Sequence, residues 1–316
     1  MHAHILYTPE LRHLKALRDQ LEGEIYVTTG ETPPAITTVL ISGRPTREQM
    51  YLAPHATALI IPFAGLDEAT RELLLDFRYT RVYNLHHNAP MTAEMAISLL
   101  MSAAKRLVPA DRVFRQHDWT PRHDPMPSLI LDGKTAVILG YGAIGQRVGR
   151  VCEALGMRIL PVRRSGGEGY YTPDQLPDLL PQAHVVMGCL PGTPETDGMI
   201  GAAELALLPE GAIVVNVGRA NTFDEGALYD ALKIGRLGCA GLDVWYRYPP
   251  DADSRKHYPP ANYPFHELDN VVMSPHRAGG LGVDEVELRR MAALAEMLNA
   301  LKRGDDVPAV DLKRGY

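Results

Sequence analysis

Cysteine is scarce in this chain of 316 residues, and the three that occur lie far apart, at Cys152, Cys189 and Cys239. Each lies in an apolar run, so they are expected to be buried small side chains in a reducing compartment. Their spacing indicates neither a disulfide framework nor a cysteine metal site. Long apolar runs are also missing: none approaches a membrane span, and the first residues lack the basic start and apolar stretch of a signal peptide. A soluble cytoplasmic protein without a membrane partner is therefore expected.

The chain also lacks an excess of one charge. Its formal net charge is −6, which gives no reason to expect nucleic acid or an anionic membrane as a partner. There is no low-complexity segment and no repeat of fixed period. A chain of this length can bury an ample core, and two domains are the natural expectation.

The clearest motif is a glycine-rich turn between an apolar run, 135–139, and a helical pattern, 146–155. Strand, G-x-G-x-x-G and helix together indicate dinucleotide binding. The first glycine allows a tight turn, the second lets the backbone approach a pyrophosphate, and the third lets the helix pack on the strand. A purely structural turn is the alternative. The residues expected to hold the cofactor here are Gly140, Gly142, Ala143, Ile144 and Gly145.

Short strand patterns alternate with helical patterns along the whole chain, which predicts an α/β fold with two doubly wound parallel sheets. Ligands of such sheets bind beyond the carboxyl ends of the strands. The helical pattern of 91–107 is apolar on most of its surface and is interpreted as the connector between domains. The last helix, 284–301, is expected to return to the first domain. The predicted domains are 1–98 with 285–316, and 99–284.

Five further stretches carry a resemblance to a known family. They are Leu131–Thr135, Leu190–Thr196, Val215–Arg219, Gly241–Val244 and Ser274–Gly279. With these motifs in order, nearly the whole chain resembles the D-isomer-specific 2-hydroxyacid dehydrogenases, in their glyoxylate/hydroxypyruvate reductase-like branch. The resemblance implies a Rossmann-type cofactor domain and a smaller flavodoxin-like substrate domain, with the active site in a cleft between them. It also implies a homodimer formed through the cofactor domain.

The resemblance assigns roles residue by residue. Arg219 matches the arginine that binds the substrate carboxylate and carbonyl, a task suited to a planar bidentate donor. His276 matches the proton donor in reduction and the base in oxidation, and Asp243 matches an aspartate near the nicotinamide. Without their motifs, an arginine after a strand is usually solvated and a histidine after Ser-Pro is usually a loop residue. The turn of Phe63, Ala64 and Gly65 matches the family's carboxylate-binding loop. Further cofactor contacts are expected from Leu190, Pro191, Thr196, Val217, Gly218, Asp243 and Gly279.

The end of the second strand of the cofactor domain departs from the NAD pattern. NAD-binding relatives carry an acidic residue there, which binds the ribose 2′-hydroxyl. This chain has Arg163, Arg164 and Ser165 instead. Two guanidinium groups and a hydroxyl suit a 2′-phosphate. NADP(H) is therefore predicted as the preferred cofactor, with NAD(H) as the alternative if the turn is merely a solvated basic one.

A second departure concerns the proton relay. The family usually places a glutamate five residues after the aspartate, where it pairs with the histidine, but this chain has Tyr248 there. A tyrosine can hydrogen-bond an imidazole but brings no negative charge near neutral pH. The imidazolium should be less favoured, so an acidic optimum for reduction is predicted. The branch of formate dehydrogenases uses glutamine there. Whether Glu267, Asp251 or Asp253 replaces the glutamate is left open.

The predicted function is NADPH-dependent reduction of a small 2-oxo acid to the D-2-hydroxy acid, and the reverse. The alternatives are an NAD-linked dehydrogenase of another small acid, such as formate or phosphite, and a nucleotide-binding regulatory protein of the corepressor type. The pairs His2/His4 and His86/His87 have no carboxylate or cysteine at a ligand spacing, so no metal site is predicted. The substrate side chain is not determined by the sequence.

Overall fold

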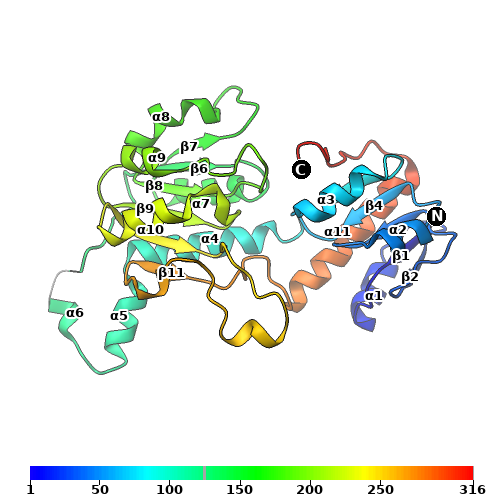
Figure 1. Cartoon of the computed structure of the whole chain (residues 1–316), viewed down its shortest axis with the longest axis horizontal. Helices are drawn as coiled ribbons and strands as arrows, with labels where there is room; N and C mark the ends of the chain where they lie inside the picture. The colour runs from blue at the N-terminus through cyan, green and yellow to red at the C-terminus, as the bar shows by residue number, and fades with distance from the viewer. Residues whose placement is uncertain (124–125, 316) are drawn as a thin grey trace. The chain divides into compact units, whose positions relative to one another are not determined.

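The computed structural model describes residues 1–123 and 126–315. The chain divides into two compact units, Met1–Asn88 with Gly280–Tyr316, and Ala89–Gly279 (Figure 1). Each unit has one all-parallel sheet with helices, which confirms the predicted fold class. The divisions expected at 98/99 and 284/285 fall inside helices α4 (Ala89–Ala104) and α11 (Asp284–Arg303). The roles predicted for the two units, and the cleft between them, stay predictions.

The first unit has the strand order β2-β1-β3-β4-β5, which is the flavodoxin-like order. Helices α1 and α11 cover one face of its sheet, where Leu17, Leu294 and Leu298 pack on Ile5 and Ile60. Helices α2 and α3 cover the other face. The elements are β1 (His2–Ile5), α1 (Leu11–Arg18), β2 (Tyr26–Thr29), β3 (Val39–Ile41), α2 (Arg47–Leu52), β4 (Ala58–Ile61), α3 (Glu68–Leu75), β5 (Arg81–Asn84) and α11.

The second unit has the strand order β11-β10-β9-β8-β6-β7. The order reverses at β6, which lies between β7 and β8, so the ligand-binding crevice is expected there. Dinucleotide-binding sheets have a third strand beyond β7, but the described residues of this chain form a single bridge there, Val162 to Tyr171, and no strand. The strands are β6 (Thr135–Leu139), β7 (Arg158–Val162), β8 (Val185–Gly188), β9 (Ala212–Asn216), β10 (Leu237–Leu242) and β11 (Val271–Met273).

Helices cover both faces of this second sheet. Helices α4 and α7 pack on one face, and α8, α9 and α10 pack on the other. Helix α4 comes so close that a Cβ placed on Gly241 of β10 would lie 2.8 Å from the Cβ of Leu99. The remaining helices are α5 (Leu107–Phe114), α6 (Thr120–His123), α7 (Gly145–Ala154), α8 (Leu176–Leu179), α9 (Ala202–Leu207) and α10 (Glu225–Lys233).

The sequence patterns located the long helices well but did not predict the end of α4 at Ala104. Arg106 adopts a left-handed conformation, so the connector helix ends at Ala104 and a separate helix α5 begins at Leu107. In α11 the buried stripe includes Val286 and Met291, whereas Leu288 is exposed. Within residues 1–123 and 126–315, no helix has the length and apolarity needed to cross a membrane.

Candidate active site

The predicted site residues of the second unit all follow the carboxyl ends of its strands. Gly140 follows β6, Arg163 follows β7, Leu190 lies just after β8, Arg219 follows β9 and His276 follows β11. Because all six strands are parallel, these loops emerge at the same edge of the sheet. That edge is where α/β sheets of this kind bind their ligands.

The glycine-rich turn has the backbone geometry that the motif predicts. Gly140 has φ +90°, and a Cβ there would lie 2.9 Å from the carbonyl oxygen of Cys189. A Cβ on Gly145 would lie 2.0 Å from the carbonyl oxygen of Gly140, so only glycine fits. Gly142 is exposed and a Cβ there would meet nothing within 4 Å. The turn therefore presents open backbone at Gly142 beside the N-terminus of α7, which fits a pyrophosphate.

The turn that carries Arg219 is shaped by a buried asparagine. Asn216 donates from Nδ2 to the carbonyl oxygen of Arg219 (2.9 Å), and its Oδ1 accepts the N–H of Gly218 (3.0 Å). A Cβ on Gly218 would lie 2.5 Å from the carbonyl oxygen of Leu190, so the loops after β8 and β9 pack backbone to backbone. Sequence reasoning gave Asn216 no role. An asparagine two residues before a glycine is nevertheless a recognisable turn signal.

Gly192 is a second residue whose role was missed. The aliphatic part of Arg219 lies over it, since a Cβ on Gly192 would be 3.1 Å from the Cγ of Arg219. The loop of Gly192 is held internally by Thr196, whose hydroxyl donates to the carbonyl oxygen of Pro191 (2.8 Å) and accepts the N–H of Thr193 (2.9 Å). This loop thereby limits the orientations open to Arg219. The cofactor contact predicted for Thr196 stays a prediction.

The fully buried carboxylate of Asp243 organises the loop that carries His276. Oδ1 accepts the Ser274 hydroxyl and the Arg277 N–H (2.9 Å), and Oδ2 accepts the Ala278 N–H (3.0 Å). The carbonyl oxygen of Asp243 also accepts the N–H of His276 (2.8 Å). These bonds bracket His276, which has φ +54°, a left-handed conformation that is unfavourable for a side chain of this size. The structure thus gives Asp243 a positioning role that its motif did not reveal.

Tyr248 lies beside the imidazole of His276, in the place where the family pattern has glutamate. Its hydroxyl is 2.8 Å from Nδ1 of His276, and it accepts the N–H of Trp245 (3.1 Å). The carboxylates left open by the sequence have other neighbours: Asp251 accepts the N–H of Ser254, and Glu267 lies 4.0 Å from His266. In the described ranges, no carboxylate forms an ion pair with His276.

The protonation of His276 follows from this neighbourhood. His276 is exposed at the surface of the site. Desolvation by the surrounding chain nevertheless lowers the pKa of its imidazole below 6.5. The negative charge of Asp243 raises that pKa and the positive charge of Arg219 lowers it. Desolvation raises the pKa of Tyr248 above 10. The hydroxyl therefore stays protonated near neutral pH and brings no charge to the imidazole.

The basic turn after β7 is folded back on itself. Nε of Arg163 donates to the carbonyl oxygen of Gly166 (2.6 Å), and its guanidinium carbon lies 3.7 Å from the ring centre of Tyr170. The ring of Tyr170 in turn lies 5.8 Å from that of Tyr141 in the glycine-rich turn. Arg163 is thereby held in one orientation beside the expected cofactor position, while Arg164 is exposed.

The predicted carboxylate-binding turn belongs to the first unit and follows β4. Asn84 donates from Nδ2 to the carbonyl oxygen of Ala64 (2.8 Å) and so braces the turn. The Phe63 ring packs against Gly43, where a Cβ would lie 2.4 Å from the ring. Burial, Arg290 and His86 lower the pKa of His87 to about 4, so this histidine is neutral. That this turn forms one site with Arg219 and His276 stays a prediction.

Comparison with known proteins agrees with the motifs. A family model described as the NAD binding domain of D-isomer specific 2-hydroxyacid dehydrogenases matches residues 97–278. A glyoxylate reductase from Korarchaeum cryptofilum is 39% identical over 224 residues, which are 69% of this chain and 64% of that protein. A D-3-phosphoglycerate dehydrogenase from Archaeoglobus fulgidus is 34% identical over 223 residues, which are 69% of this chain and 40% of that protein. The match therefore spans less than two thirds of either relative.

The fold is shared over almost the full length with solved structures. An NADPH-dependent glyoxylate/hydroxypyruvate reductase from Sinorhizobium meliloti, in complex with NADP and malonate, superposes with a TM-score of 0.73 at 23% identity. That comparison covers 98% of this chain and 99% of the other. The family model covers more than half of the chain, and the predicted motifs lie at one sheet edge. The chain therefore belongs to the D-isomer-specific 2-hydroxyacid dehydrogenase family.

Proposed function

We propose that the protein reduces a small 2-oxo acid to the D-2-hydroxy acid with NADPH, and catalyses the reverse reaction. The observation that carries this proposal is that Arg219 and His276 occupy loops at the edge of the sheet that also bears the glycine-rich turn. The two are close enough for the charge of Arg219 to lower the pKa of His276. A regulatory nucleotide-binding protein would have no chemical need for both.

Each of the site residues has a separate role in the proposed reaction. When bound at the glycine-rich turn, the reduced nicotinamide supplies the hydride. Arg219 would bind the substrate carboxylate and polarise the carbonyl oxygen through its planar donors. His276 would donate a proton from Nε2 to the developing alkoxide, while Tyr248 holds Nδ1 at 2.8 Å. Asp243 would keep the imidazole in place through its bonds to the loop.

The proposal is tested by NADPH oxidation with a panel of 2-oxo acids that includes glyoxylate and hydroxypyruvate. Turnover of at least one of them is expected. Nucleotide binding without turnover of any 2-oxo acid would instead support the regulatory alternative. Turnover of formate with NAD would support the alternative of an NAD-linked dehydrogenase of another small acid.

The cofactor preference is a prediction of its own. We expect kcat/KM to be at least about tenfold higher with NADPH than with NADH, because charge-assisted hydrogen bonds of this kind contribute roughly 1.5–3 kcal/mol. Arg163→Gln should lower kcat/KM for NADPH and leave that for NADH nearly unchanged. Arg158→Gln, at the other end of β7, is the matched control and should leave the ratio alone. Equal values for the two cofactors in the wild type would contradict the prediction.

We propose in addition that the protein is a homodimer formed through helices α5 and α6. These helices bury none of their residues, and they project away from the sheet of their own unit in Figure 1. Their apolar side chains are exposed: Leu107 58%, Phe114 51% and the neighbouring Trp119 58%. The rings of Phe114 and Trp119 meet edge to face, 4.8 Å apart. Such an apolar patch is typical of an interaction surface.

Light scattering after gel filtration tests the dimer. The wild type is expected to have twice the mass of one chain. Trp119→Asp, which places a charge in the patch, should shift it toward the monomer. Leu11→Asp, at an even more exposed apolar residue of the first unit, should leave the mass unchanged. A monomeric wild type would rule this proposal out.

A further inference from the structure

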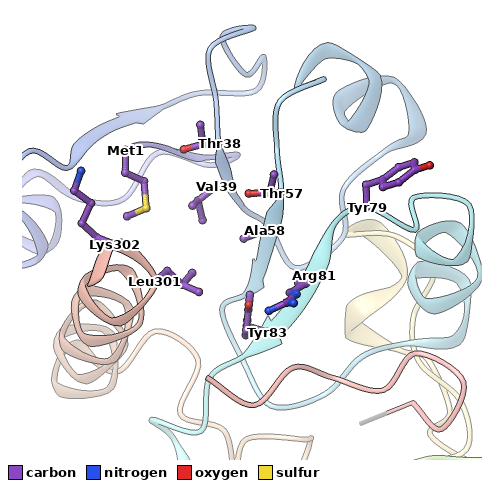
Figure 2. Close-up of a pocket in the computed structure, with 10 residues that line it drawn as sticks. All are labelled: Met1, Thr38, Val39, Thr57, Ala58, Tyr79, Arg81, Tyr83, Leu301 and Lys302. Atoms are coloured by element: carbon purple, nitrogen blue, oxygen red, sulfur yellow. The ribbon is translucent and has the colours of Figure 1, made fainter. Parts of the chain in front are cut away.

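The first unit has a pocket at the amino ends of its strands. The predicted carboxylate-binding turn lies at the opposite edge of the same sheet. Its volume is about 540 Å³ (Figure 2), which is within the range of small-molecule sites. The first residues of three neighbouring strands line it, Val39 of β3, Ala58 of β4 and Arg81 of β5. The last turn of α11 closes the other side with Leu301 and Lys302. Figure 2 shows Lys302 and Arg81 on opposite sides, with Val39 and Ala58 between them.

The charges of the pocket are of one sign. Arg81 and Lys302 line it, and no aspartate or glutamate does. Neither cation forms an ion pair with an acid elsewhere in residues 1–123 and 126–315. Several exposed arginines of this chain do have such partners, as Arg47 with Asp76 and Arg303 with Glu22 show. The pocket therefore concentrates positive charge that the described chain does not neutralise.

A tyrosine hydroxyl adds a third donor. Tyr83 is only 4% exposed and its ring packs in the core of the first unit, yet it also lines the pocket. Its hydroxyl makes no hydrogen bond with any residue of the described part of the chain. Arg81 and Tyr83 are two residues apart on β5, so their side chains leave the strand on the same face. Because Tyr83 lines the pocket, its hydroxyl can donate a hydrogen bond to a ligand there.

We propose that this pocket binds a small organic dianion with two carboxylates. One carboxylate would meet Arg81, which presents planar paired donors, together with the hydroxyl of Tyr83. The other would meet Lys302 at the end of α11. The short carbon chain between them would lie on the apolar floor of Val39, Ala58 and Leu301. A neutral ligand would leave both cations without a counter-charge.

The experiment is a calorimetric titration of the full chain with succinate, which lacks the 2-oxo group of the proposed substrates. Saturable binding of one succinate per chain is expected at this pocket. Arg81→Gln and Lys302→Gln should each weaken it at least about tenfold, since hydrogen bonds to charged groups contribute about 1.5–3 kcal/mol. Tyr83→Phe should weaken it severalfold while preserving the packing of the ring. Arg78→Gln removes an exposed charge that does not line the pocket and should bind succinate like the wild type.

Arg219→Gln separates this pocket from the proposed active site. Binding that survives Arg219→Gln and is lost in Arg81→Gln supports the proposal. Binding that is lost in Arg219→Gln, an equal loss in Arg78→Gln, or no saturable binding by the wild type would overturn it. Thermal unfolding of each variant shows that it is folded before it is titrated. Butyrate, with a single carboxylate, should bind at least about tenfold more weakly than succinate.

Discussion

Arg219→Ala is expected to lower kcat/KM for NADPH-dependent reduction of glyoxylate by about a thousandfold, because it removes the donor that we propose stabilises the developing oxyanion. It also removes the group proposed to hold the substrate carboxylate. Arg219→Lys keeps the charge and loses the planar fork, so it should recover only part of the activity. The measurement is steady-state kinetics with saturating NADPH.

His276→Ala is expected to lower the same kcat/KM by about a hundredfold to ten-thousandfold, the usual contribution of a positioned proton donor. His266→Ala is the control, since His266 is an exposed histidine that lies 4.0 Å from Glu267. Both site variants should still bind NADPH, because neither changes the glycine-rich turn. Turnover that survives both substitutions would refute the assignment of the site.

Tyr248→Glu is expected to shift the pH profile of reduction upward. In the wild type the pKa of His276 is lowered below 6.5, first by desolvation and then by Arg219. Reduction needs the imidazolium, so kcat/KM should be highest at acidic pH and fall about tenfold per pH unit above that lowered pKa. A carboxylate near Nδ1 favours the charged imidazole, and such a neighbour raises a pKa by about 1–3 units. The midpoint of the decline should therefore move to higher pH.

Tyr248→Gln is the matched control, because it has the shape of glutamate without the charge. Its profile should lack the upward shift. Oxidation of the hydroxy acid needs the neutral imidazole, so its activity should rise with pH through the same midpoint in each variant. Identical profiles for the glutamate and glutamine variants, or a wild type whose reduction rate stays flat to pH 8, would speak against a weakened relay.

Much of the cofactor unit could be predicted from local sequence. Gly145 is required by a backbone contact within its own turn and Gly140 by its positive φ, so their spacing carries the structure. The replacement of the usual acidic residue by Arg163 can likewise be recognised from the sequence, because it concerns a single position at the end of one strand. The two parallel sheets followed from alternating strand and helix patterns. These features depend on residues that are neighbours along the chain.

The contacts that position the candidate site were set by tertiary structure. Asp243 reaches Arg277 and Ala278, and Tyr248 reaches His276, across about thirty residues, because β10 and β11 are adjacent. The periodicity of one segment cannot predict such hydrogen bonds between residues of different segments. The motif at Asp243 indicated an active-site acid, but only the fold showed its carboxylate buried beneath the loop of His276.

The sequence by itself determined the family, the glycine-rich turn and the basic residues after β7, because each is a short pattern imposed by backbone sterics or local charge. The tertiary structure decided the neighbours of His276, the packing of Gly192 against Arg219, and the pocket that joins Arg81 to Lys302. Those residues are brought together only when strands and helices from distant parts of the chain pack around a common core. The order of the parallel strands determines which distant residues become neighbours, and the spacing of residues along the chain does not.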